Sequence, residues 1–99
     1  MQENSICLSR ALELLGSKWT ISILWRLCSE PKGFNQLSRE LEGISPRVLS
    51  VRLKELVEAD LASKTIHPTN PPTVEYALTQ KGLSLRPILQ SLQSWNTTN

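Results

Sequence analysis

The sequence predicts a mainly α-helical fold with a small β-hairpin (α+β), arranged as a winged helix-turn-helix. Apolar residues recur at helical spacing in several separate segments, which indicates amphipathic helices. A short helical segment, a break at Gly43 and a second amphipathic helix form the pattern of a helix-turn-helix. Two short extended segments joined by a proline-rich run come next, where a wing is expected. The length of 99 residues favours a single domain over 1–99.

The first two helices are predicted from their apolar patterns. A helix over about 6–15 ends before Gly16, and Ser17 is the expected N-cap of the next helix, which runs from Lys18 to about Ser29. This second helix is apolar around most of its circumference, so we expect it to be the central one. Residues 30–33 (EPKG) are expected to end it.

The helix-turn-helix is predicted over about 34–59. Its first helix covers about 35–41, and its second begins with Ser45 at the N-cap and Pro46 at the first helical position. That second helix ends near Asp60, and its core stripe has the spacing i, i+4, i+7 and i+8. The stripe consists of Leu49, Leu53, Leu56 and Val57.

The wing and the last helix complete the chain. Strands over about 61–67 and 74–78 flank a proline-rich tip, so the wing spans about 61–79. Thr79 is the expected N-cap of a helix over about 80–96. Pro87 lies inside that segment and should kink it or divide it in two.

The outer face of the second helix of the helix-turn-helix carries the pattern that suggests DNA binding. Glu55 and Glu58 appear only near its C-terminal end, so its first turns hold cations and no acid. A recognition helix that enters the major groove by its N-terminal turns needs this layout. The alternative is an ordinary solvated helix face. The face consists of Arg47, Ser50, Val51 and Lys54.

Each residue of this face has a predicted role. Arg47 is suited to bidentate hydrogen bonds with guanine, Ser50 to a base or a phosphate, and Val51 to a thymine methyl group. Arg52, on the flank, and Lys54 are expected to contact phosphates, which position the protein without reading sequence.

Further DNA contacts are predicted around this helix. Polar residues near the start of the preceding helix are suited to holding a phosphate, although Asn35 has helix capping as an alternative role. The wing holds no arginine, so we expect weaker wing contacts, mostly to phosphates or sugars. The predicted residues are Asn35, Gln36, Arg39, Ser45, Lys64, His67, Asn70 and Thr73.

The composition argues against other classes of protein. One histidine, one aspartate, and the lack of a nucleophile motif or glycine-rich phosphate loop argue against an enzyme and against a bound cofactor. Cys7 and Cys28 form no CxxC pair and have no recognised zinc spacing with His67, so no metal is predicted. No apolar run approaches the roughly 18 residues of a membrane span, and the polar N-terminus does not resemble a signal peptide. We therefore expect a cytoplasmic protein with no membrane partner.

The same segments resemble the HxlR-type winged-helix regulators, which are MarR-like. The resemblance runs from Cys7 to about Trp95, and its most specific parts are the GISP block and the PPTVEY block. The matching segments are 14–20 (LLGSKWT), 32–37 (KGFNQL), 43–49 (GISPRVL), 52–56 (RLKEL), 71–79 (PPTVEYALT) and 81–82 (KG). The family often has a basic residue where Thr73 stands, so its usual wing contact is not expected here.

The resemblance implies a bacterial or archaeal regulator that binds double-stranded DNA as a homodimer through its terminal helices. The alternative is that these apolar stripes pack only on their own subunit. Many members also have cysteine at the position of Cys7, and some sense oxidants through it, although here Leu8 replaces the usual following proline. The implied dimer interface consists of Ile6, Leu8, Leu12, Leu15, Ile88, Leu89, Leu92 and Trp95.

Two functions therefore compete. The favoured one is a sequence-specific regulator, most simply a repressor, that binds an inverted repeat with half-sites about 34 Å apart. The alternative is a winged-helix module that binds protein and not DNA. A signal is possible in two forms: oxidation of Cys7 or Cys28, or a small molecule between the dimer helices near Trp19, Trp25 and Trp95, which are otherwise core residues.

Overall fold

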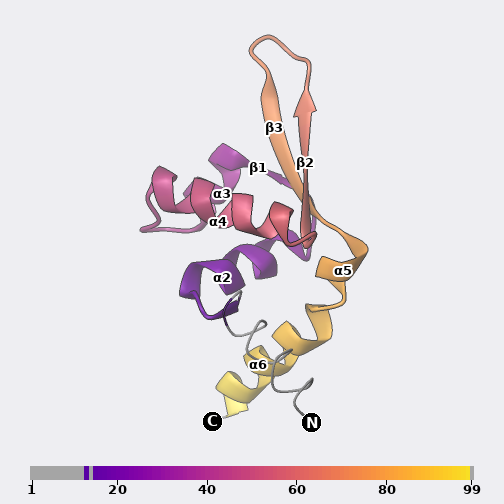
Figure 1. Cartoon of the computed structure of the whole chain (residues 1–99). Coiled ribbons are helices and arrows are strands. Elements are labelled where there is room, and N and C mark those ends of the chain that lie inside the picture. The colour runs from indigo at the N-terminus through magenta and orange to yellow at the C-terminus, as the bar shows by residue number, and fades with distance from the viewer. Residues whose placement is uncertain (1–12, 14, 99) are drawn as a thin grey trace.

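A computed structural model describes residues 13 and 15–98 (Figure 1). Ile6, Cys7, Leu8 and Leu12, with most of the predicted helix over 6–15, lie outside the described residues; residues 13 and 15 are helical. The elements are α2 (Lys18–Leu27), β1 (Lys32–Gly33), α3 (Phe34–Glu40), α4 (Pro46–Glu58), β2 (Ala62–His67), β3 (Thr73–Leu78), α5 (Gln80–Leu83) and α6 (Arg86–Thr98). This order confirms the predicted winged helix-turn-helix.

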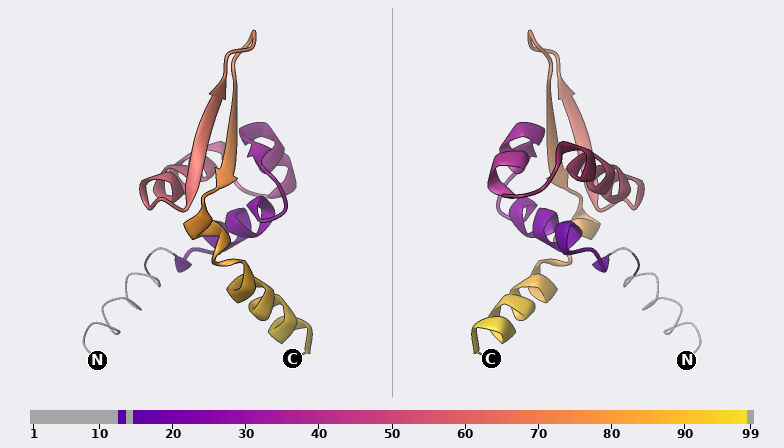
Figure 2. Two further views of the ribbon diagram at one scale, coloured as in Figure 1. Left: turned by 90° about the vertical axis from the view of Figure 1, so that its right-hand side faces the viewer. Right: turned by 90° about the vertical axis from the view of Figure 1, so that its left-hand side faces the viewer.

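The wing is part of a three-stranded antiparallel sheet with the order β1-β3-β2. β3 lies in the centre, with Tyr76 opposite Lys32 on one side and Lys64 on the other. β1 is not predicted from the sequence, because a strand of two residues has no alternation to detect and forms only where β3 offers a second edge. The hairpin of β2 and β3 extends past the short β1 and projects away from the helices, at the opposite end of the molecule from α6 (Figure 2).

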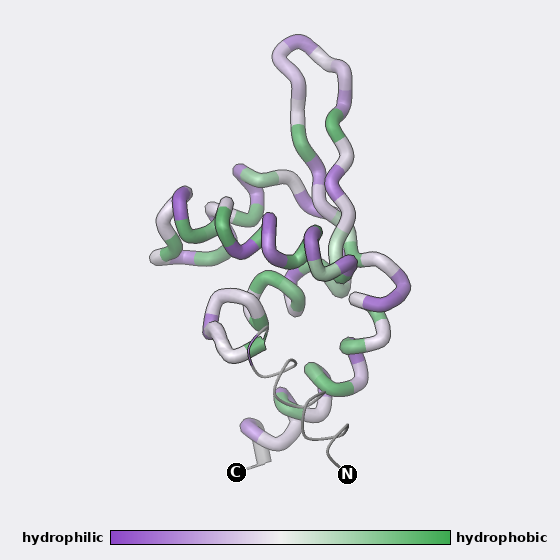
Figure 3. Tube along the Cα trace, in the orientation of Figure 1, coloured by the Kyte–Doolittle hydropathy of each residue, from purple (hydrophilic) through white to green (hydrophobic). Residues whose placement is uncertain are grey.

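The core lies around α2, as predicted. Ile23 and Leu24 are fully buried, and apolar segments of α2 and α4 meet beside the base of the hairpin (Figure 3). The hairpin tip is hydrophilic. Leu49, Leu53 and Leu56 are also fully buried, which confirms the inner stripe of α4. The remaining buried apolar residues are Leu27, Cys28, Leu37, Leu41, Ile44, Leu61, Ala62, Tyr76 and Leu89.

The helix-turn-helix is fixed by its turn and by one cap. Gly43 has φ 94°, a left-handed conformation that glycine adopts readily, and it reverses the chain between α3 and α4. The Ser45 hydroxyl then accepts a hydrogen bond from the amide of Val48 at 3.1 Å, which confirms the predicted cap. Ser17 stands at the N-cap of α2, as predicted, but makes no side-chain cap bond. α3 begins after Gly33, so Asn35 lies inside that helix and does not cap it.

The end of α4 turns the chain into the wing. Asp60 has φ 61°; its amide donates to the Val57 carbonyl at 3.0 Å, and the amide of Leu61 donates to the Leu56 carbonyl at 2.9 Å. These two bonds make a Schellman motif, which satisfies the last carbonyls of the helix. Leu56 and Leu61 are both buried beside it. The direction of β2 relative to α4 is therefore set by local hydrogen bonds.

The last helix is divided, as Pro87 predicts. Thr79 caps the short α5, because its hydroxyl accepts from the amide of Gly82 at 3.1 Å and donates to the carbonyl of Asp60 at 2.6 Å. α6 then starts at Arg86, so Pro87 lies in its first turn, where a missing amide hydrogen breaks no helical bond.

A partly buried ion pair joins β1 to α3. Lys32 is almost fully buried, and its Nζ lies 3.1 Å from Oε2 of Glu40 and 3.5 Å from Oε1 of Glu30. The same carboxylate of Glu40 accepts a hydrogen bond from Gln36, and Arg26 lies 3.9 Å from its other oxygen. These contacts lower the pKa of Glu40, chiefly through the hydrogen bond from Lys32.

This pair gives the protein a predicted acid sensitivity. The pKa of Glu40 is lower in the folded state than in the unfolded state. The ionised carboxylate therefore stabilises the fold fully above the unfolded-state pKa, and this stabilisation is lost as the pH falls through the folded-state pKa. We expect the free energy of unfolding to fall as the pH is lowered from about 4.5, and Lys32→Met to flatten that dependence. Denaturant unfolding between pH 3 and 7 measures both. Lys64→Met, at an exposed lysine, is the control, and an unchanged profile in Lys32→Met would contradict the assignment.

Candidate nucleic-acid interface

The outer face of α4 has the form that the sequence predicts. Arg47, Ser50, Val51 and Lys54 are all exposed, and the side chain of Val51 is 46% exposed despite being apolar. Within the described residues, neither Arg47 nor Lys54 has an ion pair, so both charges are available to a partner. The first turn of α4 contains no acid. The face is therefore exposed, carries a cation at its N-terminal end, and includes one apolar side chain.

Arg52 lies apart from this face. Its Nη1 donates a hydrogen bond to Oε1 of Glu55 at 2.8 Å, and the side chain is only 32% exposed. Its Nε is buried and has no hydrogen-bond partner. The structure thus ties Arg52 to its own helix, and a contact with phosphate would have to compete with Glu55. Helical spacing could not reveal this, because the pairing depends on which rotamer each side chain adopts.

Of the DNA-contacting residues predicted on α3 and before α4, some are exposed and others make hydrogen bonds within the chain. Asn35 and Arg39 on α3 are exposed. Gln36 is half-buried and donates to Glu40 of the same helix, and the hydroxyl of Ser45 is used as the cap of α4. Of this group, Asn35 and Arg39 are the ones free to reach a phosphate.

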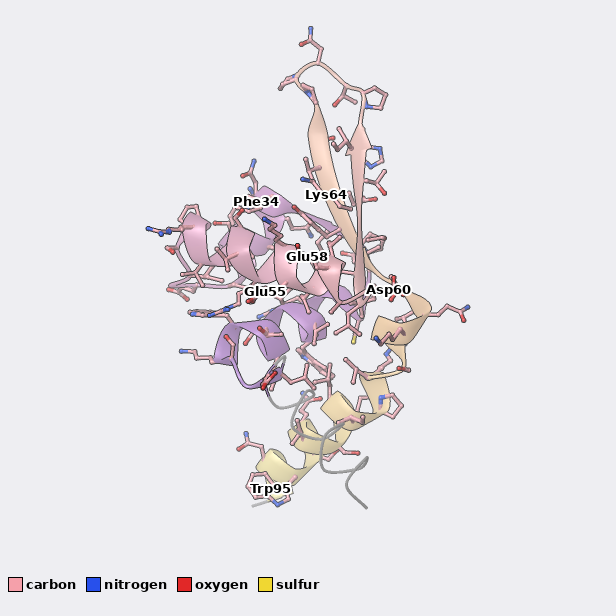
Figure 4. The ribbon with its side chains drawn as sticks, viewed as in Figure 1. Phe34, Glu55, Glu58, Asp60, Lys64 and Trp95 are labelled. Atoms are coloured by element: carbon pink, nitrogen blue, oxygen red, sulfur yellow. The ribbon has the colours of Figure 1, made fainter. Side chains whose placement is uncertain are left out.

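The wing separates its predicted residues onto two faces. Residues opposite each other in an antiparallel pair point to the same side, so Lys64 lies on the side of the buried Tyr76. Figure 4 shows Lys64 on the flank of the hairpin that faces the helices. His67 and Thr73 form a pair on the other side, and Nε2 of His67 lies 3.5 Å from Oε1 of Glu75. Asn70 is exposed at the tip.

The second half of α4 carries acids. Glu55 is held by Arg52, whereas Glu58 is exposed, and Figure 4 shows it on α4 toward the hairpin, with Asp60 beyond it. The charges of the candidate interface are therefore unevenly distributed. Cations lie at the start of α4 and on the wing, and a carboxylate lies between them.

Among the described residues, the one cysteine, Cys28, is poorly suited to rapid redox chemistry. Its side chain is buried, and burial raises the pKa of its thiol, although the charge of Arg86 acts in the opposite direction. The thiolate is the reactive form, so a raised pKa lowers reactivity. Residues 13 and 15–98 contain no cluster of three or more His, Cys, Asp or Glu side chains that could hold a metal ion.

α6 exposes three of its four residues that the resemblance implies for a dimer interface. Ile88, Leu92 and Trp95 are 54%, 49% and 65% exposed, so Trp95 is not a core residue. Leu89 is buried against α2 and belongs to the core of its own chain, and Leu15 is half-buried against that core. Trp19 and Trp25 are half-buried at the edge of the core, as expected. No helix in the described part of the chain is both long and apolar enough to span a membrane.

The family model for the HxlR-like helix-turn-helix matches residues 14–99, which is most of the chain. The chain belongs to the HxlR-like helix-turn-helix family. The match includes α3, α4 and the wing, so the exposed face of α4 lies within the part of the chain that the family model covers.

Relatives of known sequence and structure agree with this assignment. The chain is 39% identical over 89 residues to the HTH-type transcriptional regulator BH0655 of Halalkalibacterium halodurans, covering 89% of this chain and 79% of that one. It is 34% identical over 94 residues to the HTH-type transcriptional regulator YodB of Bacillus subtilis, covering 93% and 84%. The redox regulator HypR in its reduced form superimposes with a TM-score of 0.88 at 29% identity, covering 93% and 91%. The HxlR-like chain is thus a transcriptional regulator with a DNA-binding helix-turn-helix.

Proposed function

We propose that this HxlR-like regulator binds an inverted-repeat operator as a homodimer, with α4 in the major groove. The observation that carries the proposal is the exposed face of α4, where Arg47 and Lys54 have no ion pair among the described residues. In this arrangement Arg47, Ser50 and Val51 read base edges from the N-terminal turns. Lys54, Arg39 and Lys64 contact phosphates and set the position of the helix.

The dimer is supported by the exposed face of α6. Ile88 and Leu92 are four residues apart, so they lie on one side of the helix, and both are about half exposed. Beside Leu92, an apolar groove between α2 and α6 is lined by Ile21 and Trp25. An exposed apolar surface of this kind is typical of an interaction site. A second copy of the chain would bury it and bring two α4 helices into one assembly.

Selection of duplexes from a random pool, repeated at several salt concentrations, tests DNA recognition. Enrichment of an inverted repeat with half-sites about 34 Å apart is the expected result. The affinity should fall steeply with salt, because phosphate contacts release counterions. Weak binding with no enriched sequence and no salt dependence would instead indicate a winged helix that binds protein, and would reject the regulator that reads an inverted repeat.

The dimer interface has its own prediction. Leu92→Glu places a charge at the centre of the exposed α6 face, so we expect the dimer to dissociate, because burying an unpaired charge is unfavourable. Gln90→Glu adds the same charge at an exposed position on another side of α6 and should remain dimeric. Sedimentation equilibrium of both variants, with circular dichroism to confirm folding, measures the effect. A folded Leu92→Glu protein that stays dimeric at the same concentration would place the interface elsewhere.

We further propose that the protein acts as a repressor by occupying its operator, and that a thiol oxidant is its signal. The comparison with HypR, described as a redox regulator, supports a redox signal. Because Cys28 is buried with a raised pKa, the reactive thiol in this proposal is Cys7. Loss of the oxidant effect on operator binding in Cys7→Ser, with the effect retained in Cys28→Ser, is the expected result; the reverse pattern would assign sensing to Cys28.

A further inference from the structure

Glu58 lies on the same side of α4 as the residues proposed to contact DNA. It is four residues after Lys54, seven after Val51 and eleven after Arg47, spacings that return to one face of a helix. At about 1.5 Å per residue, Glu58 is roughly 16 Å along the axis from Arg47. When the N-terminal turns of α4 enter the groove, Glu58 is therefore carried away from the base edges and toward the DNA backbone.

The carboxylate of Glu58 is available there. In the described part of the chain it makes no hydrogen bond and no ion pair, whereas the neighbouring Glu55 is bound by Arg52. Lys54 lies one helical turn before it, and Lys64 lies beyond it on the flank of the wing that faces the helices (Figure 4). Lys54 and Lys64, two of the cations proposed to contact phosphates, thus have an unpaired negative charge between them.

This position also disfavours an acid in the folded chain. Glu58 is the last residue of α4, and its last turn contains no basic residue. The C-terminal end of a helix carries partial negative charge, so a carboxylate there is repelled by it. Folding of the monomer therefore gives no reason for a glutamate at this position. The variant Glu58→Gln, which has a neutral amide there, should be at least as stable.

We propose that Glu58 is a specificity-determining residue that repels the phosphate backbone and so weakens binding to non-operator DNA. The proposal rests on the DNA-binding function proposed above for α4. In the operator complex, base contacts from Arg47 fix the depth and register of the helix, and Lys54 and Lys64 offset the nearby acid. In non-operator complexes nothing fixes the register, and Glu58 meets phosphates as α4 moves along the backbone. A repulsive element of this kind lowers affinity for wrong partners more than for the right one.

The test compares Glu58→Gln with the unmodified protein on the selected operator and on a scrambled duplex of the same length. One charge about 4 Å from a phosphate in water corresponds to about a fivefold change in affinity. We expect Glu58→Gln to bind the scrambled duplex about fivefold more tightly and the operator less than twofold more tightly, with a steeper salt dependence on the scrambled duplex. Its midpoint of thermal unfolding should be equal or higher, which confirms that it folds.

Glu13→Gln is the matched control, because it makes the same change in net charge at an exposed residue outside α4 that has no ion pair in the described part of the chain. If Glu13→Gln tightens non-specific binding as much as Glu58→Gln does, the effect is one of total charge and the proposal is wrong. It is also wrong if Glu58→Gln weakens operator binding, because the carboxylate then reads a base. If the unmodified protein binds neither duplex, the proposed function fails first, which is a distinct result.

Discussion

Gly82→Ala is expected to lower the free energy of unfolding by about 3 kcal/mol, because overpacking of a tightly filled site is strongly destabilising. A Cβ atom on Gly82 would lie 2.1 Å from the carbonyl oxygen of Leu61 and 3.1 Å from its carbonyl carbon. Both are backbone atoms, in the segment that the Schellman motif and the hydroxyl of Thr79 already hold. Neither Leu61 nor the turn of α5 that contains Gly82 can move without breaking these hydrogen bonds. The junction of α4, β2 and α5 must therefore shift as a whole.

Gly33→Ala is the matched control for this prediction. Its added Cβ would lie 3.3 Å from the carbonyl oxygen of Val74, a contact that a shift of a few tenths of an ångström relieves. Urea unfolding of both variants at neutral pH measures the difference. Equal stability of Gly82→Ala and the unmodified protein would show that α5 does not pack against Leu61 as the structure has it.

The features that the sequence predicts correctly are those that local chemistry determines. Ser45 and Pro46 mark the start of α4 because one supplies a cap and the other has no amide hydrogen to lose. The inner stripe of α4 follows from helical spacing alone, and so does the opposite, exposed face. Thr79 and Pro87 fix the division of the last helix in the same way. In each case the residues that decide the outcome are within one or two turns of each other.

The features that escape prediction depend on contacts between distant segments. β1 exists because β3 has an edge to pair with, and Lys32 is buried because Glu40 lies across from it. The same dependence explains α6, where Leu89 faces the core and the adjacent Ile88 faces outward. The apolar stripe of that helix is correct, but its division between core and surface follows from where α2 lies. Arg52 is a similar case. Helical spacing places Glu55 within its reach, but whether the two side chains pair depends on the rotamer that each adopts.

The separation of roles along α4 makes Arg47 the residue whose loss should affect DNA recognition most. Its guanidinium has no ion pair within residues 13 and 15–98, and it lies in the first turn, where a recognition helix approaches base edges. We expect Arg47→Ala to lose about 1–3 kcal/mol of operator binding, roughly 5- to 150-fold in affinity, and to relax base preference at one position of each half-site. Titration of the operator and of its single-base variants measures both effects.

Lys54→Ala distinguishes base reading from charge alone. Because Lys54 is proposed to contact phosphate, its loss should weaken binding to all sequences alike and reduce the slope of affinity against salt by about one. Arg47→Lys keeps the charge of Arg47 but removes the planar pair of donors, so it should restore salt dependence without restoring base preference. If Arg47→Ala instead behaves like Lys54→Ala, the first turn of α4 contacts the DNA phosphates. The residues that read the operator then lie elsewhere on the helix-turn-helix.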